Sequence, residues 1–196
     1  KPLAVRTPRV VTIHHVGTEV RSCFRWKLMD FLAREALIWW GSKVASAIIT
    51  VSEFTRDLVV RRYGVTYEKV RVVYSGVDPS AFFPRLRGQS ADNIGAYVYY
   101  PANTHWHKNH ATLLRAMQIV KARLNRPIVF KLTGVEGDAH RELLTLIKDL
   151  GLEDSVEWLG WVPLDTVRCL LQEAGAMIFP SLYEGFGLPV LEAMAC

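Results

Sequence analysis

The chain has 196 residues, which allows one large domain or two small ones, and half of its residues are hydrophobic, which is enough for a sizeable core. No run of about 18 uncharged apolar residues occurs, so the sequence predicts no membrane-spanning helix. The net charge of +5 suits anionic ligands, anionic lipid surfaces or nucleic acid, and it fits an ordinary solvated basic surface equally well. The basic residues form no clustered stripe, and we therefore expect no nucleic-acid partner.

The cysteines indicate a reducing compartment. Cys23, Cys169 and Cys196 are odd in number and widely spaced, so they suggest neither a disulfide framework nor a zinc site. We expect a cytoplasmic location on this basis. The chain opens with KPLAVRTPRV, without Met or a signal-peptide pattern, and we interpret this as a start partway through a domain.

The first part of the chain alternates short β-branched runs with longer helical patterns. We expect strands over residues 9–14, 47–51 and 70–74, and helices over residues 24–44 and 53–63. Ser52 is placed as the N-cap of the second helix, and Gly64 is placed to end it.

A stretch without periodicity then separates two units. Residues 79–93, PSAFFPRLRGQSADN, mix Pro, Gly and polar residues, which is typical of an interdomain linker. Beyond it we expect strands over 96–100, 128–133, 156–161 and 176–179, and helices over 110–124, 139–150 and 165–174. The predicted organisation is a first domain over residues 1–78, a linker over 79–94 and a second domain over 95–196.

Alternating strands and helices predict an α/β fold, with open parallel sheets in both domains. Ligands bind at the carboxyl ends of the strands in such sheets, so the polar residues there are candidates for the site. They are His14 and His15, Ser52, residues 75–78, residues 102–108, residues 133–134, residues 161–162 and residues 181–187.

The closing stretch FPSLYEGFGLPVLEAMAC carries the most specific pattern. Gly185 and Gly187 allow close backbone approach to a ligand, and a helix is expected to begin near Leu188 with a partial positive charge at its start. Glu184 and Glu192 could accept hydrogen bonds from sugar hydroxyls. A capped helix with a surface glutamate is the alternative, and local physics alone does not choose between them.

This stretch resembles the sugar-nucleotide site of retaining glycosyltransferases of family 4, also called glycosyl transferases group 1. Seven residues separate Glu184 from Glu192, as in the family signature. ITVSEFTRDLVVRRYGV, VRVVYSGVDPSAFFP and YPANTHWHKNHATLLRA also resemble the family. The resemblance implies the GT-B fold, with two Rossmann-like domains that are both incomplete here, and it suggests an internal fragment.

The resemblance also implies roles for individual residues. Lys108 would contact the donor diphosphate, and His14 would face the donor sugar. Asn103 stands where many members have arginine, which implies a phosphate clamp that is either weaker or supplied by other groups. The implied catalytic residues are His14, Lys108 and Glu184, and the implied donor-binding residues are Asn103, Lys108, Gly134, Val162, Glu184, Gly185, Phe186, Gly187, Leu188 and Glu192.

The implied function is retaining transfer of a hexose, such as mannose, from a GDP- or UDP-sugar to a saccharide or lipid-linked hydroxyl acceptor. This would serve surface polysaccharide or glycolipid synthesis. A sugar-nucleotide epimerase on the same fold and a non-catalytic nucleotide-sugar-binding protein remain alternatives. We expect no metal and no other cofactor, because there is no paired-aspartate motif and because His105, His107 and His110 lack accompanying carboxylates or cysteines.

The helix expected over residues 24–44 raises the question of membrane contact. It combines aromatic residues such as Trp26, Trp39 and Trp40 with basic residues such as Arg34 and Lys43. A buried helix with a basic rim is the interpretation that we favour, and peripheral contact with the inner face of a membrane is kept as the alternative.

Overall fold

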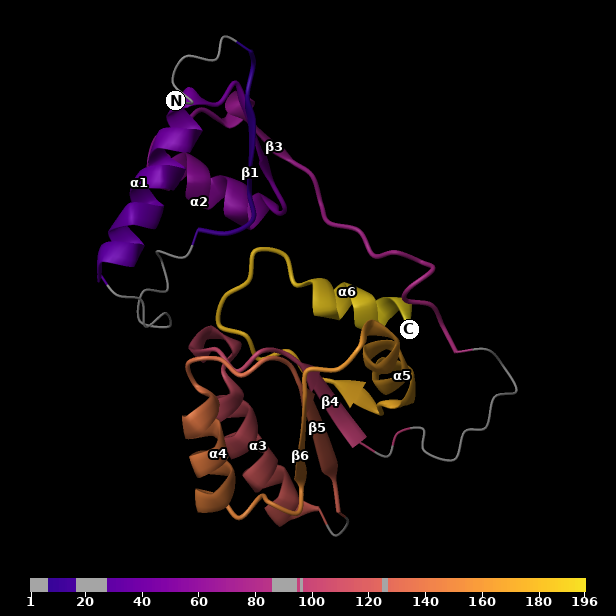
Figure 1. Cartoon of the computed structure of the whole chain (residues 1–196). Coiled ribbons are helices and arrows are strands. Elements are labelled where there is room, and N and C mark those ends of the chain that lie inside the picture. The colour runs from indigo at the N-terminus through magenta and orange to yellow at the C-terminus, as the bar shows by residue number, and fades with distance from the viewer. Residues whose placement is uncertain (1–6, 17–27, 86–94, 96, 125–126) are drawn as a thin grey trace. The chain divides into compact units, whose positions relative to one another are not determined.

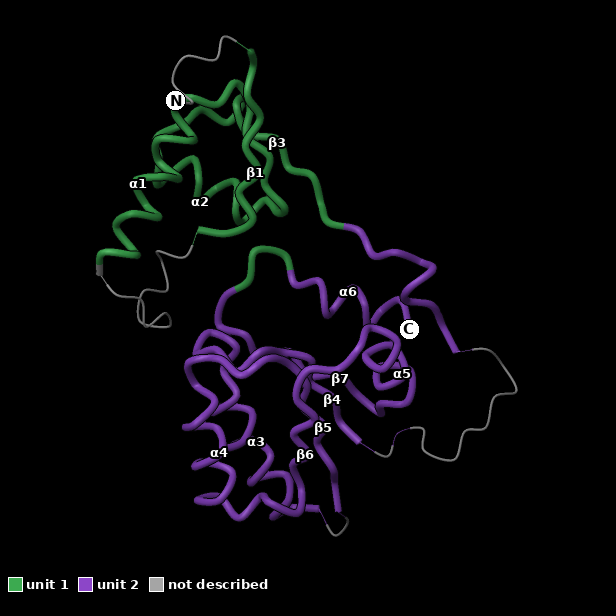
Figure 2. Tube along the Cα trace, in the orientation of Figure 1, with its two compact units in different colours: residues 1–75, 184–186 green, residues 76–183, 187–196 purple. Residues whose placement is uncertain are grey.

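The computed structural model describes residues 7–16, 28–85, 95, 97–124 and 127–196 (Figure 1). Its contacts divide the chain into two compact units (Figure 2). Unit 1 comprises residues 1–75 and 184–186, and unit 2 comprises residues 76–183 and 187–196. Most of the predicted linker, residues 86–94, lies outside the described residues.

Unit 1 contains a parallel sheet of three strands in the order β1-β2-β3. Its elements are β1 (Val10–Ile13), α1 (Leu28–Val44), β2 (Ala47–Thr50), α2 (Glu53–Tyr63), the 3-10 helix η3 (Tyr67–Lys69) and β3 (Val70–Val72). The three expected strands are therefore present but shorter than predicted. The predicted start of the first helix, residues 24–27, lies outside the described residues.

The ends of α2 follow the sequence prediction. Ser52 is the N-cap, and its Oγ accepts a hydrogen bond from the Thr55 N–H at 3.1 Å. Gly64 ends the helix in the left-handed conformation, with φ of 58°, and its N–H donates to the Val60 carbonyl. A short polar side chain satisfies the first turn and a residue without Cβ allows the last, so local chemistry sets both boundaries.

Helix α1 differs from the favoured prediction of a buried helix. Large apolar side chains lie exposed along it: Met29, Leu32, Leu37, Trp39 and Val44. Among the described residues, no helix has both the length and the apolar character needed to cross a membrane.

Unit 2 contains a parallel sheet of four strands in the order β6-β5-β4-β7. Its elements are β4 (Tyr97–Pro101), the 3-10 helix η4 (Trp106–Lys108), α3 (His110–Arg123), β5 (Val129–Thr133), α4 (His140–Asp149), β6 (Val156–Gly160), α5 (Leu164–Glu173), β7 (Ala176–Met177) and α6 (Leu188–Ala195). Strand β7 ends two residues before the predicted position, and the expected strand residue Ala96 lies outside the described part.

The alternation of side chains along β4 builds two cores. Tyr100 packs with Leu114 of α3 and Leu143 of α4 on one face, whereas Tyr97 and Tyr99 pack with α5 on the other. Figure 1 shows α3 and α4 on one side of the strands and α5 and α6 on the other. Helices cover both faces of the sheet, which explains why its central strands β4 and β5 are mostly apolar and buried, whereas the edge strand β6 keeps the exposed Glu157.

Leu114 and Ile119 offer a test of this packing, because they lie on the same helix and differ in how far their side chains are buried. Leu114 is fully buried, whereas Ile119 is about half exposed. We expect Leu114→Ala to lower the free energy of unfolding by about 2–5 kcal/mol, since it leaves a cavity. Ile119→Ala should change it by no more than about 0.5 kcal/mol. Urea denaturation followed by circular dichroism measures both, and equal losses would contradict the described core.

Candidate functional site

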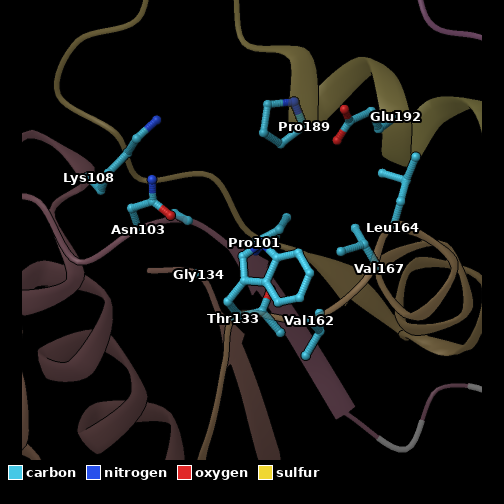
Figure 3. Close-up of a pocket in the computed structure, with 12 residues that line it drawn as sticks. Pro101, Asn103, Lys108, Thr133, Gly134, Val162, Leu164, Val167, Pro189 and Glu192 are labelled. Carbon is cyan, nitrogen blue, oxygen red and sulfur yellow. The ribbon is translucent and has the colours of Figure 1, made fainter. Parts of the chain in front are cut away.

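The strand order of unit 2 creates a crevice at β4. The chain proceeds from β4 to β5 and β6 on one side, and β7 returns to the other side of β4. In open parallel sheets such a reversal opens a crevice at the carboxyl ends of the two central strands. A cavity of about 430 Å³ lies there (Figure 3), lined by Pro101, Ala102, Asn103, Lys108, Thr133, Gly134, Trp161, Val162, Leu164, Val167, Pro189 and Glu192.

Opposite charges stand on two sides of this cavity. Lys108 and Glu192 are the charged residues among the described residues that line it. Lys108 lies beside Asn103 on one side, and Glu192 projects from α6 on the other (Figure 3). The cavity thus offers a cation to an anionic group and a carboxylate to a hydroxyl-bearing group.

Gly134 allows two loops to meet at the base of the cavity. Its φ is 145°, and a Cβ there would lie 2.5 Å from the Ala102 carbonyl oxygen and 2.7 Å from the Asn103 nitrogen. Its N–H donates to the Gly160 carbonyl at 2.8 Å, which ties the ends of β5 and β6 together. Any side chain would therefore push the end of β4 away, so glycine is required for this approach.

Asn103 is oriented by the same loop. Its Oδ1 accepts a hydrogen bond from the Val135 N–H at 2.8 Å. Its Nδ2 lies on the side of Lys108 (Figure 3). Because the oxygen is engaged with the backbone, the amide group presents donors next to the lysine, which suits an anion.

Lys108 is the last residue of η4, the 3-10 helix between β4 and α3. Its Nζ lies 5.9 Å from the centroid of the Phe179 ring, within the usual range of a cation–π contact. This contact holds the side chain near the segment that follows β7.

The N-terminus of α6 borders the cavity opposite the strands. Gly187 is its N-cap with φ of 96°, no side chain caps the helix, and Pro189 stands in its first turn. Pro189 and Glu192 line the cavity together because residues three apart share one face of a helix. The uncapped start adds a partial positive charge to the site.

Burial raises the pKa of the Glu192 carboxyl. Thr133, which lines the cavity, is hydrogen-bonded through its Oγ1 to the Tyr99 hydroxyl at 2.6 Å. Burial raises the pKa of Tyr99 to about 12. The phenol therefore stays neutral at pH 7, and burial makes ionisation of the Glu192 carboxyl less favourable in the folded chain than in the unfolded chain.

The remaining wall is apolar. Val162 follows β6, and Leu164 and Val167 project from α5 (Figure 3). The Trp161 side chain is 72% exposed although it borders the cavity. This wall offers a surface against which a flat, uncharged group can pack.

Five of the predicted site residues line this one cavity: Asn103, Lys108, Gly134, Val162 and Glu192. Gly187 and Leu188 form the start of α6. His14 lies in unit 1, with which Glu184, Gly185 and Phe186 are also grouped, so their predicted roles stay predictions. The prediction did not include Leu164 and Val167, because only the packing of α5 brings them to the strand ends.

His105, His107 and His110, which the sequence raised as a possible metal cluster, make different contacts in the structure. His105 Nδ1 lies 3.1 Å from Asp138 Oδ1, and its ring stacks on that of His107. His110 is buried against Tyr100, and burial is the main cause that lowers its pKa to about 4, so it is neutral at pH 7. Among the described residues, no three His, Cys, Asp or Glu side chains form a group suited to a metal.

Two solved structures illustrate the likeness in fold. HepE of Anabaena, in complex with UDP and glucose, has a TM-score of 0.76 and 22% identity, covering 97% of this chain and 51% of its own. Sucrose-phosphate synthase of Thermosynechococcus elongatus has a TM-score of 0.81 and 22% identity, covering 100% and 50%. These likenesses define the fold class as GT-B, as predicted.

Family models match both parts of the chain. The model of glycosyl transferases group 1 matches residues 87–196, and that of glycosyltransferase family 4 matches residues 2–81. The chain therefore belongs to glycosyl transferases group 1, which confirms the resemblance drawn from its motifs.

Curated relatives agree with this assignment. An uncharacterized glycosyltransferase of Methanocaldococcus jannaschii is 31% identical over 97% of this chain and 50% of its own length. The O-antigen chain mannosyltransferase of Salmonella typhimurium is 30% identical over 81% and 42%. The GDP-mannose:cellobiosyl-diphosphopolyprenol alpha-mannosyltransferase of Xanthomonas oryzae is 28% identical over 100% and 49%. The chain spans about half the length of the curated relatives that it matches.

The raised pKa of Glu192 predicts a pH-dependent gain from Glu192→Gln. The folded state holds the proton more tightly than the unfolded state, so ionisation opposes folding. The penalty is absent below the unfolded pKa, grows as pH rises towards the folded pKa, and is complete above it. We expect Glu192→Gln to be more stable than the wild type at pH 7, with the gain shrinking as pH falls towards 4.

Urea denaturation between pH 4 and pH 8 measures this difference. Glu153→Gln is the control, since it removes one carboxylate from an exposed position. A Glu192→Gln variant that is less stable than the wild type at pH 7, or that shows the same pH profile as Glu153→Gln, would contradict the cost assigned to the partly buried Glu192 carboxylate.

Proposed function

We propose that this chain forms the donor-binding part of a retaining hexosyltransferase, which moves a hexose from a nucleoside-diphosphate sugar to a hydroxyl acceptor. One observation carries the proposal: the cavity at the end of β4 sets Lys108 and Glu192 on opposite sides of one space. A nucleoside diphosphate has a matching polarity, with anionic phosphates at one end and ribose hydroxyls nearer the other.

The diphosphate would lie on the side of Lys108. The ammonium group, the Asn103 amide and the uncapped start of α6 all favour negative charge. They would stabilise the charge that develops on the phosphate as the bond to the sugar breaks. Fixed donors are effective in this role because they need no reorganisation during the reaction.

The nucleoside would occupy the other side. The Glu192 carboxylate accepts hydrogen bonds from two ribose hydroxyls, and the base packs against the apolar wall of Trp161, Val162 and Leu164. The raised pKa of Glu192 supports a functional role, because partial burial of this carboxyl disfavours its charged form in the folded chain.

Departure of the nucleotide would leave oxocarbenium-like character on the sugar. The acceptor hydroxyl would attack from the face of the leaving group, assisted by the phosphate oxygens, which retains the anomeric configuration. For His14 and Glu184, the family resemblance implies contacts with the donor sugar, and these roles are part of the proposal. We assign no residue as a covalent nucleophile.

The relatives support a choice of sugar and acceptor. The Salmonella and Xanthomonas relatives are named mannosyltransferases, and the latter name includes a diphosphopolyprenol acceptor. We propose mannose as the hexose and a lipid-linked saccharide as the acceptor, in surface polysaccharide or glycolipid synthesis. The exposed apolar side chains of α1 support peripheral contact with the inner face of a membrane, which agrees with a cytoplasmic enzyme.

The relatives also bear on the alternatives. Those described above carry transferase names, which favours transfer over epimerisation and over binding without catalysis. Independence from metals stays a prediction that rests on the missing paired-aspartate motif. The base is open as well, since HepE binds UDP whereas the Xanthomonas relative is named for GDP-mannose.

Calorimetric titration of the chain with GDP, UDP and inorganic pyrophosphate tests the proposal. We expect saturable binding of one nucleotide. Lys108→Ala should weaken that nucleotide and pyrophosphate alike, by about 10- to 100-fold, because a charge-assisted hydrogen bond is lost. Glu192→Ala should weaken the nucleotide but leave pyrophosphate unchanged, because only the nucleotide carries a ribose.

Lys148→Ala and Glu153→Ala are the matched controls, since both residues are exposed and lie outside the cavity. If the folded wild-type chain binds neither nucleotide, or if the controls weaken binding as much as the site variants do, the proposed donor site is wrong.

A further inference from the structure

Asn109 has an unusual backbone for its residue type. Asn109 has a positive φ of 59°, and no other non-glycine residue among those described does. Left-handed backbone is uncommon for residues with a Cβ, although Asn tolerates it better than most. The residue lies directly after Lys108, at the junction between η4 and α3.

The Asn109 side chain does not serve the helix that it precedes. Asn is a preferred N-cap residue, yet here it makes no capping hydrogen bond to α3. Its Nδ2 instead donates to the Pro180 carbonyl, 71 residues further along the chain, at 3.0 Å. The left-handed turn therefore directs the side chain towards the segment that follows β7.

Neighbouring residues make matching bonds to the same segment. The Leu182 N–H donates to the His107 carbonyl at 2.8 Å. The Tyr100 hydroxyl donates to the Lys108 carbonyl at 2.7 Å and lies 3.2 Å from Ser181 Oγ. Residues 107, 108 and 109 are thus joined to residues 182, 181 and 180 in antiparallel order, with Tyr100 bridging the middle pair.

This arrangement, which we call the loop clasp, holds both backbone neighbours of Lys108. Its members are Tyr100, residues 107–109 and residues 180–182, all within unit 2. Lys108 is flanked by bonded carbonyls at positions 107 and 108 and by the fixed side chain at 109. These bonds hold the backbone on both sides of Lys108, and the Lys108 side chain reaches the cavity.

We propose that Asn109 is a positioning residue of the donor site, which fixes the backbone of Lys108 so that its ammonium group meets the diphosphate. The inference rests on the function proposed above, and Asn109 itself does not line the cavity. Tyr100 acts in the same way from β4. The clasp also joins the segment of Lys108 to residues 180–182, which follow β7.

A double-mutant cycle on nucleotide affinity separates positioning from general stability. Asn109→Gly keeps the left-handed backbone but removes the bond to Pro180. Tyr100→Phe keeps the buried ring and removes only its hydroxyl. The probe is whichever of GDP and UDP binds the wild-type chain more tightly, measured by calorimetry. Each variant is made alone and combined with Lys108→Ala.

We expect Asn109→Gly to weaken binding about three- to tenfold in the wild-type background, a size usual for coupled neighbours. In the Lys108→Ala background, it should change the dissociation constant by less than about twofold, because the group that it positions is already gone. Tyr100→Phe should repeat this pattern, and it carries the test alone if Asn109→Gly does not fold.

Gln118→Ala is the control, because it also removes a side-chain amide that donates to a carbonyl, that of Leu150, away from the cavity. It should leave affinity unchanged in both backgrounds. Equal weakening by Asn109→Gly in the two backgrounds, or none in the wild type, would overturn the positioning role alone. If Lys108→Ala does not weaken binding, the proposed function and this inference both fail.

Discussion

Backbone pairing of β4 with a neighbour on each side is the constraint on which the site depends. β5 pairs along the whole of β4 on one side, whereas β7 pairs with only two of its residues on the other. The chain must leave the sheet in opposite directions from these two neighbours, so a crevice opens at the end of β4, where the cavity lies. Gly134 lets the loops after β4 and β5 meet at the floor of that space, and α6 starts at its rim.

The site combines rigid backbone with two charges of opposite sign. The loop clasp fixes the segment that carries Lys108, while Glu192 sits on a helix whose first turn faces the cavity. Burial raises the pKa of the Glu192 carboxyl, so its ionisation lowers the stability of the folded chain. Because Glu192 lies opposite Lys108 in the cavity, we interpret this cost as one that ligand binding requires. A residue that opposes folding yet suits a ligand is typical of binding sites.

Much of the fold could be predicted, because the parallel strands are mostly β-branched and apolar runs and because the caps of α2 depend on Ser52 and Gly64. The 3-10 helices η3 and η4 were missed, since three residues show no hydrophobic period.

The family signature pointed to Lys108 and Glu192. Leu164 and Val167 reach the cavity only through the packing of α5, and the bond from Asn109 to Pro180 joins segments 71 residues apart, so the sequence carried no signal for either.

Hydrogen–deuterium exchange of the chain, with and without saturating GDP or UDP, tests the donor site most directly, because it reports backbone amides rather than side-chain losses. We expect the nucleotide to slow exchange at residues 102–109, 133–135 and 187–190, which surround the cavity, and to leave α4 unchanged over residues 140–149. Protection centred on α4, or bound nucleotide without protection at the ends of β4 and β5, would contradict a donor site at this edge of the sheet.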